Sequence, residues 1–166
     1  MNIDQPLALY ADTVRKEWID YNGHMNVAYY VLVFDFASDA FLEFLGLDTQ
    51  LRERHQVSTF AAESHVTYQR ELKEGDPLRL TTQILGFDSK RIHYFHRMYH
   101  ADDGFLASTL ETLSLCMDMR LRRVGRWPPD VLTRIGNIAA GHATLAVPRE
   151  KGHAIGTPMP PVVPGA

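Results

Sequence analysis

Hydrophobic and polar positions along the chain follow two periods. From Val27 to Leu45, apolar side chains recur at offsets of three, four, seven and eight residues, which predicts a helix that Gly46 ends. Further aromatic and aliphatic side chains cover most of the circumference of this helix. A helix that is apolar nearly all round is buried, so we expect the rest of the chain to wrap it.

Alternating patterns on both sides of this helix predict strands. Residues 8–19 have the β-branched and aromatic content of a first strand, and residues 48–55 read as a short polar helix or an extended turn. Four later strands are expected at residues 57–72, 78–87, 92–100 and 105–119. Turns are expected at residues 73–77, 88–91 and 101–104. Within 57–72, strict alternation places Phe60, Ala62, Ser64, Val66 and Tyr68 on one face, and Ala61, Glu63, His65, Thr67 and Gln69 on the other.

These elements predict an α+β domain in which an antiparallel sheet of about five strands curls around one long central helix. The open edge strands of such a sheet favour pairing between two subunits, so we expect a homodimer. Residues 1–140 form the single predicted domain. Residues 141–166 form a tail rich in Pro and Gly, expected to be extended, mobile or draped on a partner.

Composition narrows the function classes. The 166 residues are 45% hydrophobic and 22% charged with a net charge of −3, typical of a soluble globular protein without an electrostatic footprint for nucleic acid. No run of 18 apolar residues predicts a membrane span, and the N-terminus lacks a signal-peptide pattern, so we expect a cytoplasmic protein. The single cysteine, Cys116, lies in an apolar run and reads as a core residue. Four arginines at 120, 122, 123 and 126 read as a solvated edge.

The stretch "DYNGHMN" at residues 20–26 lies directly before the predicted helix. A structural interpretation accounts for much of it, because Asn22-Gly23 favours a turn and Asn26 is a preferred N-cap. A chemical interpretation is also open. A helix N-terminus offers unpaired N–H groups that can hold a developing oxyanion, and the Asp20 carboxylate could face the same carbonyl carbon.

The stretch "WIDYNGHMNVAYYVLVFDFASDAFLEFLGL" resembles the 4-hydroxybenzoyl-coenzyme A thioesterase-type hotdog family. Members carry Asp, two variable residues, Gly-His, one more residue and Asn before the central helix. Those positions are filled here by Asp20, Gly23, His24 and Asn26. The resemblance covers about residues 10–135. Val27 departs from it, because a second Asn often follows the first in the family.

The resemblance implies hydrolysis of an acyl-coenzyme A thioester, with the coenzyme as part of the substrate and no cofactor. Asp20 would activate water or attack the carbonyl, and backbone N–H groups near Asn26 and Val27 would polarise it. His24 and Asn26 would hold the loop or the water. The family also implies active sites at the interface of a dimer or a dimer of dimers, where Glu63 or His65 of the partner subunit can contribute. Lys90 and Arg91 match the segment that lies along the coenzyme; the alternative is a solvated turn.

More narrowly, "WIDYNGHMNVAYYV" resembles the thioesterases that accompany carnitine dehydrogenase, which implies betainyl-coenzyme A as substrate and a place in carnitine metabolism. Aromatic faces bind quaternary ammonium groups, so Trp18 and Tyr21 are candidates for contacting the acyl group, together with Gly23 of the loop. Tyr30 is a further candidate for contacting the substrate, although aromatic residues at the helical spacing of Tyr29 and Tyr30 usually belong to the core.

Other function classes stay open at this point. Some hotdog proteins are enoyl-coenzyme A hydratases or dehydratases, and a binding module without catalysis is a third possibility; the Gly-His-x-Asn pattern and the carboxylate at position 20 favour hydrolysis. No metal site is predicted, because His93 and His96 face opposite ways on a strand, and His96 and His100 lack a nearby carboxylate in the sequence.

Overall fold

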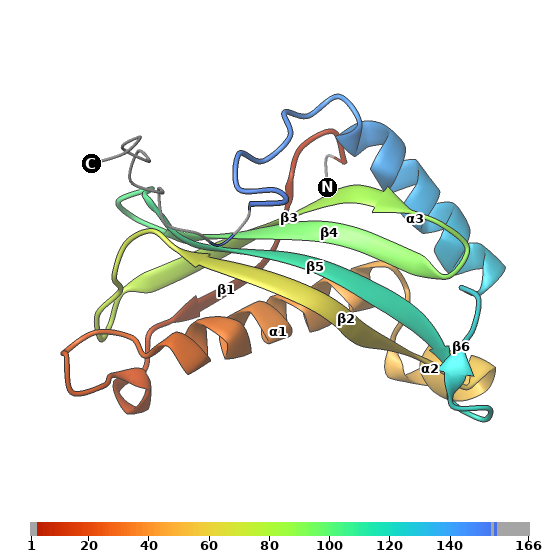
Figure 1. Ribbon diagram of the computed structural model, residues 1–166, viewed down its shortest axis with the longest axis horizontal. Helices are drawn as coiled ribbons and strands as arrows, with labels where there is room; N and C mark the ends of the chain where they lie inside the picture. The colour runs from red at the N-terminus through yellow and green to blue at the C-terminus, as the bar shows by residue number, and fades with distance from the viewer. Residues whose placement is uncertain (1–2, 154, 156–166) are drawn as a thin grey trace, which may run out of the picture.

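The computed structural model describes residues 3–153 and 155 and consists of a curled sheet wrapped around one long helix (Figure 1). The main strands are β1 (Leu7–Thr13), β2 (Val57–Tyr68), β3 (Pro77–Phe87), β4 (Arg91–His100) and β5 (Leu106–Asp118). They are antiparallel in the order β1-β3-β4-β5-β2, and the two-residue β6 (Arg123–Val124) pairs with β5. The predicted architecture of about five strands around a helix is confirmed.

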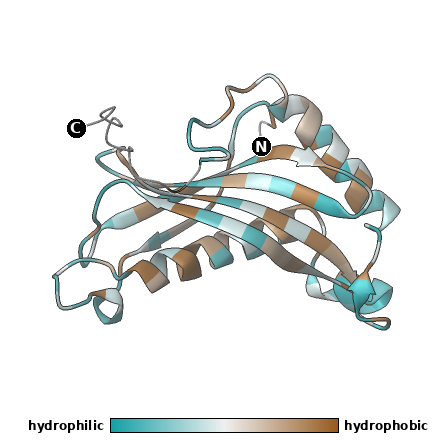
Figure 2. Cartoon of the chain, in the orientation of Figure 1, coloured by the Kyte–Doolittle hydropathy of each residue, from teal (hydrophilic) through white to brown (hydrophobic). Residues whose placement is uncertain are grey.

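The central helix, α1 (Val27–Phe44), begins and ends within one residue of the prediction. Asn26 is its N-cap and Gly46 follows with a φ of 85°, a left-handed conformation that favours glycine. Figure 2 shows hydrophobic residues recurring along α1 and alternating colours along the strands that cover it. Val33, Phe34 and Phe41 are fully buried between the helix and the sheet.

A polar network crosses this core. His96 is completely buried on β4, with its Nε2 atom 3.0 Å from Ser38 Oγ of α1 and its Nδ1 atom 2.9 Å from Thr82 Oγ1 of β3. The Tyr94 hydroxyl donates to the same Ser38 oxygen at 3.3 Å. Burial lowers the pKa of His96 to about 3, so the ring is neutral at physiological pH.

The first strand is shorter than predicted. It ends at Thr13 rather than residue 19, because its neighbour β3 begins at Pro77, the register partner of Thr13. The chain then forms one 3-10 turn, η1 (Lys16–Trp18), and a single bridge between Ile19 and Met25. This change of direction folds the loop between Ile19 and Met25 back beside the N-terminus of α1.

Strand β2 contains a bulge that strict alternation does not predict. The register shifts between Ala61 and Glu63, so the prediction that Phe60 and Ser64 share one face of the sheet was wrong. Ser64 pairs with Thr112 on the face that meets α1, and Glu63 lies on the opposite, outer face with His65. The strand ends at Tyr68 rather than at residue 72.

Two further helices complete the fold. The segment predicted as a short helix or turn is α2 (Thr49–His55), capped by Asp48, whose carboxylate accepts from the Leu51 amide at 2.7 Å. Helix α3 (Pro129–His142) was not predicted, although Val131, Ile135 and Ile138 carry its helical period. It runs past residue 140, where the predicted domain ended. Cys116 is buried, as predicted.

His142 fastens α3 to the rest of the molecule. Its Nδ1 atom accepts from the Ile84 amide of β3 at 2.9 Å, and its Nε2 atom donates to the Gln5 carbonyl at 3.1 Å. Burial lowers the pKa of this imidazole, which favours the neutral ring that can accept and donate in this way. No helix in the described part of the chain is long and apolar enough to cross a membrane.

Candidate active site

The loop before α1 is closed by its own backbone. The Gly23 amide donates to the Asp20 carbonyl at 3.0 Å, and the Asp20 amide donates to the His24 carbonyl at 3.1 Å. Gly23 has a φ of 81°, which a residue with a side chain rarely adopts. The Met25 amide then donates to the Leu72 carbonyl at 2.7 Å, which ties the loop to the segment after β2. The motif glycine is thus required by the turn that positions Asp20.

The Asp20 carboxylate lies beside the helix cap. Its Oδ1 atom accepts from the Asn22 amide at 2.8 Å, and its Oδ2 atom lies 3.4 Å from the Asn26 Nδ2 donor. Asn26 Oδ1 accepts from the Ala28 amide at 3.0 Å, which confirms the predicted N-cap. Asn26 therefore orients the carboxylate with one end of its amide and caps α1 with the other.

The two predicted oxyanion donors differ in their surroundings. The Asn26 amide donates to the Trp18 carbonyl at 2.9 Å, so it is engaged within the chain. The Val27 amide is at the first position of α1, where a helix has N–H groups without intrahelical acceptors and a partial positive charge. Val27 is therefore the better candidate for polarising a carbonyl next to Asp20.

A cavity of about 190 Å³ opens beside this junction. Its walls come from the loop, the first turn of α1, the end of β2 and the three residues after it: His24, Met25, Val27, Tyr30, Tyr68, Gln69, Arg70 and Glu71. His24 and Val27 belong both to the motif and to the cavity wall. An acyl group in this cavity would lie next to the helix N-terminus.

Two tyrosines form a corner of the cavity. The rings of Tyr30 and Tyr68 have centroids 5.3 Å apart and planes at 85°. Tyr30 is buried, and burial raises its pKa to about 12; Tyr68 is 49% exposed. The predicted contact of Tyr30 with substrate is thus compatible with its position, and Tyr68 is a cavity residue that strand alternation did not single out.

The structure does not bring Trp18 and Tyr21 together. The Trp18 ring is buried, stacks on Tyr29 at 5.8 Å between centroids, and has the Arg15 guanidinium 4.7 Å from its centroid. Tyr21 is 96% exposed in the loop. Within the chain, these two predicted substrate contacts therefore do not form a cage.

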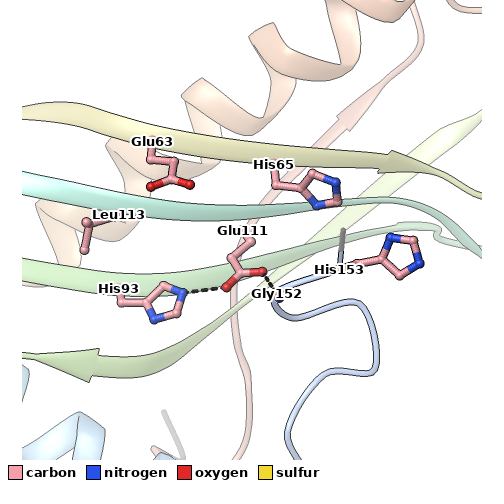
Figure 3. Close-up of a pocket in the computed structure, with 7 residues that line it drawn as sticks. All are labelled: Glu63, His65, His93, Glu111, Leu113, Gly152 and His153. Carbon is pink, nitrogen blue, oxygen red and sulfur yellow. Dashed lines mark hydrogen bonds and ion pairs between the residues drawn. The ribbon is translucent and has the colours of Figure 1, made fainter. Parts of the chain in front are cut away.

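Glu63 lies on the outer face of the sheet, away from α1 (Figure 3). There it lines a cavity of about 370 Å³ with His65, His93, Glu111, Leu113, Gly152 and His153. His93 Nε2 lies 2.8 Å from Glu111 Oε1. His93 faces this cavity and His96 faces the core, as predicted. No group of three or more metal-binding side chains within residues 3–153 and 155 is arranged to hold a metal ion.

Residues 145–153, which we call the strap, lie over this outer face. The Gly152 amide donates to Glu111 Oε2 at 2.6 Å, and the Ala146 carbonyl accepts from Gln83 Nε2 at 3.3 Å. The His153 ring lies 6.2 Å from the His65 ring between centroids. The start of the predicted tail is therefore bound to its own sheet, and residues 156–166 lie outside the described part.

Lys90 and Arg91 lie at the turn between β3 and β4. Lys90 lines a third cavity, of about 370 Å³, with Arg123, Arg126 and Asp118. Arg91 instead pairs with Asp88 at 2.6 Å. This basic cavity adjoins β6, at the opposite end of α1 from the Asp20 loop (Figure 1). The chain therefore holds the carboxylate and the cations far apart.

Comparisons with known proteins show which family the chain belongs to. The sequence model of the thioesterase-like superfamily matches residues 14–135. The betainyl-CoA thioesterase of Pseudomonas aeruginosa is 38% identical over 96% of this chain and 99% of its own length. The L-carnitine dehydrogenase/betainyl-CoA thioesterase of Rhizobium meliloti is 36% identical over 91% of this chain, which corresponds to 30% of that longer protein.

Two solved structures share the fold and are also related to this chain in sequence. A Staphylococcus aureus protein in complex with CoA has a TM-score of 0.83 and 33% identity, covering 92% of this chain and 97% of that one. A putative thioesterase of Pseudomonas putida has a TM-score of 0.81 and 30% identity, covering 93% of this chain and 99% of that one.

Proposed function

The chain belongs to the thioesterase-like superfamily and is a thioester hydrolase, and we propose that its substrate is betainyl-coenzyme A. The 38% identity to a betainyl-CoA thioesterase, over nearly the whole length of both chains, is the observation that carries this proposal. Two fused proteins whose names include the same activity match at 36% and 32% identity. A role in carnitine metabolism follows from the proposed substrate.

In the proposed reaction, the thioester carbonyl lies beside the Val27 amide and the Asp20 carboxylate. Asp20 takes a proton from water, the water oxygen bonds to the carbonyl carbon, and the carbonyl oxygen gains negative charge near the helix N-terminus. The C–S bond then breaks and the thiolate takes the proton that Asp20 removed from water, which gives betaine and free coenzyme A. A thiol pKa near 8.5 makes this leaving group good without a strong general acid.

The other motif residues keep Asp20 in place. Gly23 allows the turn, and Asn26 contacts the carboxylate while it caps α1. His24 lies in the cavity wall, where it can hold the water or the loop. This chemistry uses water and side chains of the protein and requires no cofactor.

We propose a homodimer formed through the open edge of β2, the last strand in the sheet order. In an antiparallel β2–β2 pair, the Val57 end of one strand lies beside the Tyr68 end of the other. The partner's basic cavity, near its own Val57 end, would thus approach the Asp20 loop of the first subunit. The cations at Lys90, Arg123 and Arg126 can then meet the phosphates of a coenzyme whose thioester reaches Asp20.

Thiol release from a panel of acyl-coenzyme A substrates tests the function directly. We expect the purified protein to release coenzyme A from betainyl-coenzyme A with a higher kcat/KM than from acetyl- or benzoyl-coenzyme A. Release from other acyl groups only would keep the thioesterase activity and contradict the proposed substrate. No release from any thioester by folded protein would leave the hydratase or binding-module alternatives.

Lysine in the middle of the edge strand should separate the subunits. Ala62 is exposed in the bulge of β2, so we expect Ala62→Lys to fold but to block strand pairing, as edge lysines do. Sedimentation should give a monomer of 18.9 kDa with thioesterase activity lost, while Ala101→Lys, in the exposed turn after β4, should stay dimeric and active. A fully active Ala62→Lys monomer would contradict a site shared between subunits.

A further inference from the structure

We propose that the corner formed by Tyr30 and Tyr68, together with the Glu71 carboxylate, binds the trimethylammonium group of the acyl chain and sets the specificity for a cationic substrate. This inference rests on the proposed function and identifies where the charge of that substrate is recognised. The site lies in the cavity of about 190 Å³ beside the N-terminus of α1.

The geometry of the two rings suits a quaternary ammonium group. With planes at 85° and centroids 5.3 Å apart, Tyr30 and Tyr68 form two walls that meet nearly at a right angle. A cation near the face of a tyrosine is attracted by the ring quadrupole, and methyl groups on nitrogen also gain apolar contact. Tyr30 is held rigidly by burial, whereas the half-exposed Tyr68 leaves the cavity open to an entering substrate.

The charges around the cavity add to this preference. Glu71 lines the cavity, so its carboxylate adds negative charge to the wall that holds the two rings. Burial is the main cause that raises the pKa of the Tyr30 hydroxyl; a backbone hydrogen bond at Leu72 lowers it, and the charges of Glu71 and Asp76 raise it further. Lys73 lies 3.7 Å from Glu71, but both side chains are mostly exposed, so water screens this pair.

One cation also lines the cavity. The Arg70 guanidinium lies over the Phe105 ring, 3.9 Å from its centroid, which directs its charge to that ring. This contact places the guanidinium over Phe105 rather than over Tyr30 or Tyr68. Arg70 keeps its positive charge, and the Glu71 carboxylate in the same cavity wall offsets it.

The alternative pair of aromatics is less suited to the task. One face of Trp18 stacks on Tyr29, and the Arg15 guanidinium already lies near the Trp18 ring. Tyr21 alone, almost fully exposed, offers no enclosed site. The corner of Tyr30 and Tyr68 also shares a cavity with Val27, so a short acyl chain can reach from the corner to the predicted oxyanion donor.

A neutral substrate of the same shape separates charge recognition from general binding. 3,3-Dimethylbutyryl-coenzyme A replaces the trimethylammonium group of betainyl-coenzyme A with a tert-butyl group. We expect the wild-type protein to prefer betainyl-coenzyme A in kcat/KM. Tyr68→Leu should lower the ratio of the two kcat/KM values by about 2- to 30-fold, the range of one cation–π contact, and Tyr68→Phe should preserve it. Glu71→Gln should lower the ratio in the same direction.

Tyr99→Leu is the matched control, because Tyr99 lies on β4 with Arg79 over its ring and does not line the cavity. Equal losses on both substrates in Tyr68→Leu, or a wild-type protein without preference for the charged substrate, would overturn the inference while hydrolysis of betainyl-coenzyme A stands. A lowered ratio in Tyr21→Leu but not in Tyr68→Leu would move the ammonium site to the loop. If folded wild-type protein hydrolyses other thioesters but not betainyl-coenzyme A, the proposed substrate fails and the ammonium site fails with it.

Discussion

Asp20→Asn is expected to lower kcat for thioester hydrolysis by about 10²–10⁴-fold, the range that a positioned general base contributes. The side-chain oxygen of asparagine can still accept from the Asn22 amide, which Asp20 does at 2.8 Å, so the turn should persist. What is lost is the negative oxygen beside Asn26 that would take a proton from water or attack the carbonyl. Single-turnover measurements of thiol release, at saturating substrate, isolate this chemical step.

Asp48→Asn provides the matched control. Asp48 also accepts a backbone amide with its carboxylate, but it caps α2, at the other end of α1 from the loop (Figure 1). Both variants should unfold at nearly the same urea concentration as wild type, and only Asp20→Asn should lose turnover. Wild-type turnover in Asp20→Asn would transfer the catalytic role to another carboxylate, with Glu63 of the sheet as the next candidate.

Replacing the buried imidazole is expected to change how stability depends on pH. The pKa of His96 is about 3 in the folded protein, against about 6.5 in an unfolded chain. Between these values the unfolded chain binds more protons, so this contribution to stability is fully present above pH 6.5 and is lost as pH falls toward 3. From pH 7.5 to 4.5 the loss amounts to about 3 kcal/mol.

His96→Gln removes the titrating ring and keeps polar atoms facing Ser38 and Thr82. Near pH 7.5 we expect the variant to be less stable by about 2 kcal/mol, the cost of imperfect buried hydrogen bonds. By pH 4.5 this gap should close or reverse, as measured by urea unfolding at one fixed protein concentration. His142 is present in both proteins, so its contribution cancels in the difference between their unfolding free energies. The control variant His55→Gln, at an exposed position, should show no such change with pH. A stability difference between wild type and His96→Gln that stays constant with pH would show that the pKa of His96 is the same in the folded and unfolded chain.

The sequence supports the architecture well because long patterns carry it. The apolar surface of residues 27–44 and the alternation in the later strands each extend over ten or more residues, so single exceptions do not hide them. Shorter features depend on contacts distant in sequence. The end of β1 at Thr13 is decided by Pro77 in the neighbouring strand, and the period of α3 is weakened by Gly136 and Gly141.

The candidate site also contains residues that the sequence predicts and one that it does not. Asp20 and Asn26 were predictable because a turn, a cap and a family motif coincide in seven residues, and the structure adds their contact at 3.4 Å. Tyr68 was not predictable as a partner of Tyr30, since the two are 38 positions apart and no local pattern says where the end of β2 meets α1. Pairing across a sheet requires the register, which the sequence alone does not contain.

The hydrogen bond between the strap and Glu111 has a consequence for sequence divergence. Gly152 donates to a carboxylate that also holds His93, so a half-buried acid on β5 depends on a segment outside the part of the chain that the superfamily model matches. In relatives that lack or remodel residues 145–153, the hydrogen bond from the strap to the acid at position 111 is absent. The pair formed by the residues at 111 and 93 is then less strongly constrained. We therefore expect these two positions to vary together with the strap, independently of Asp20 and the loop before α1.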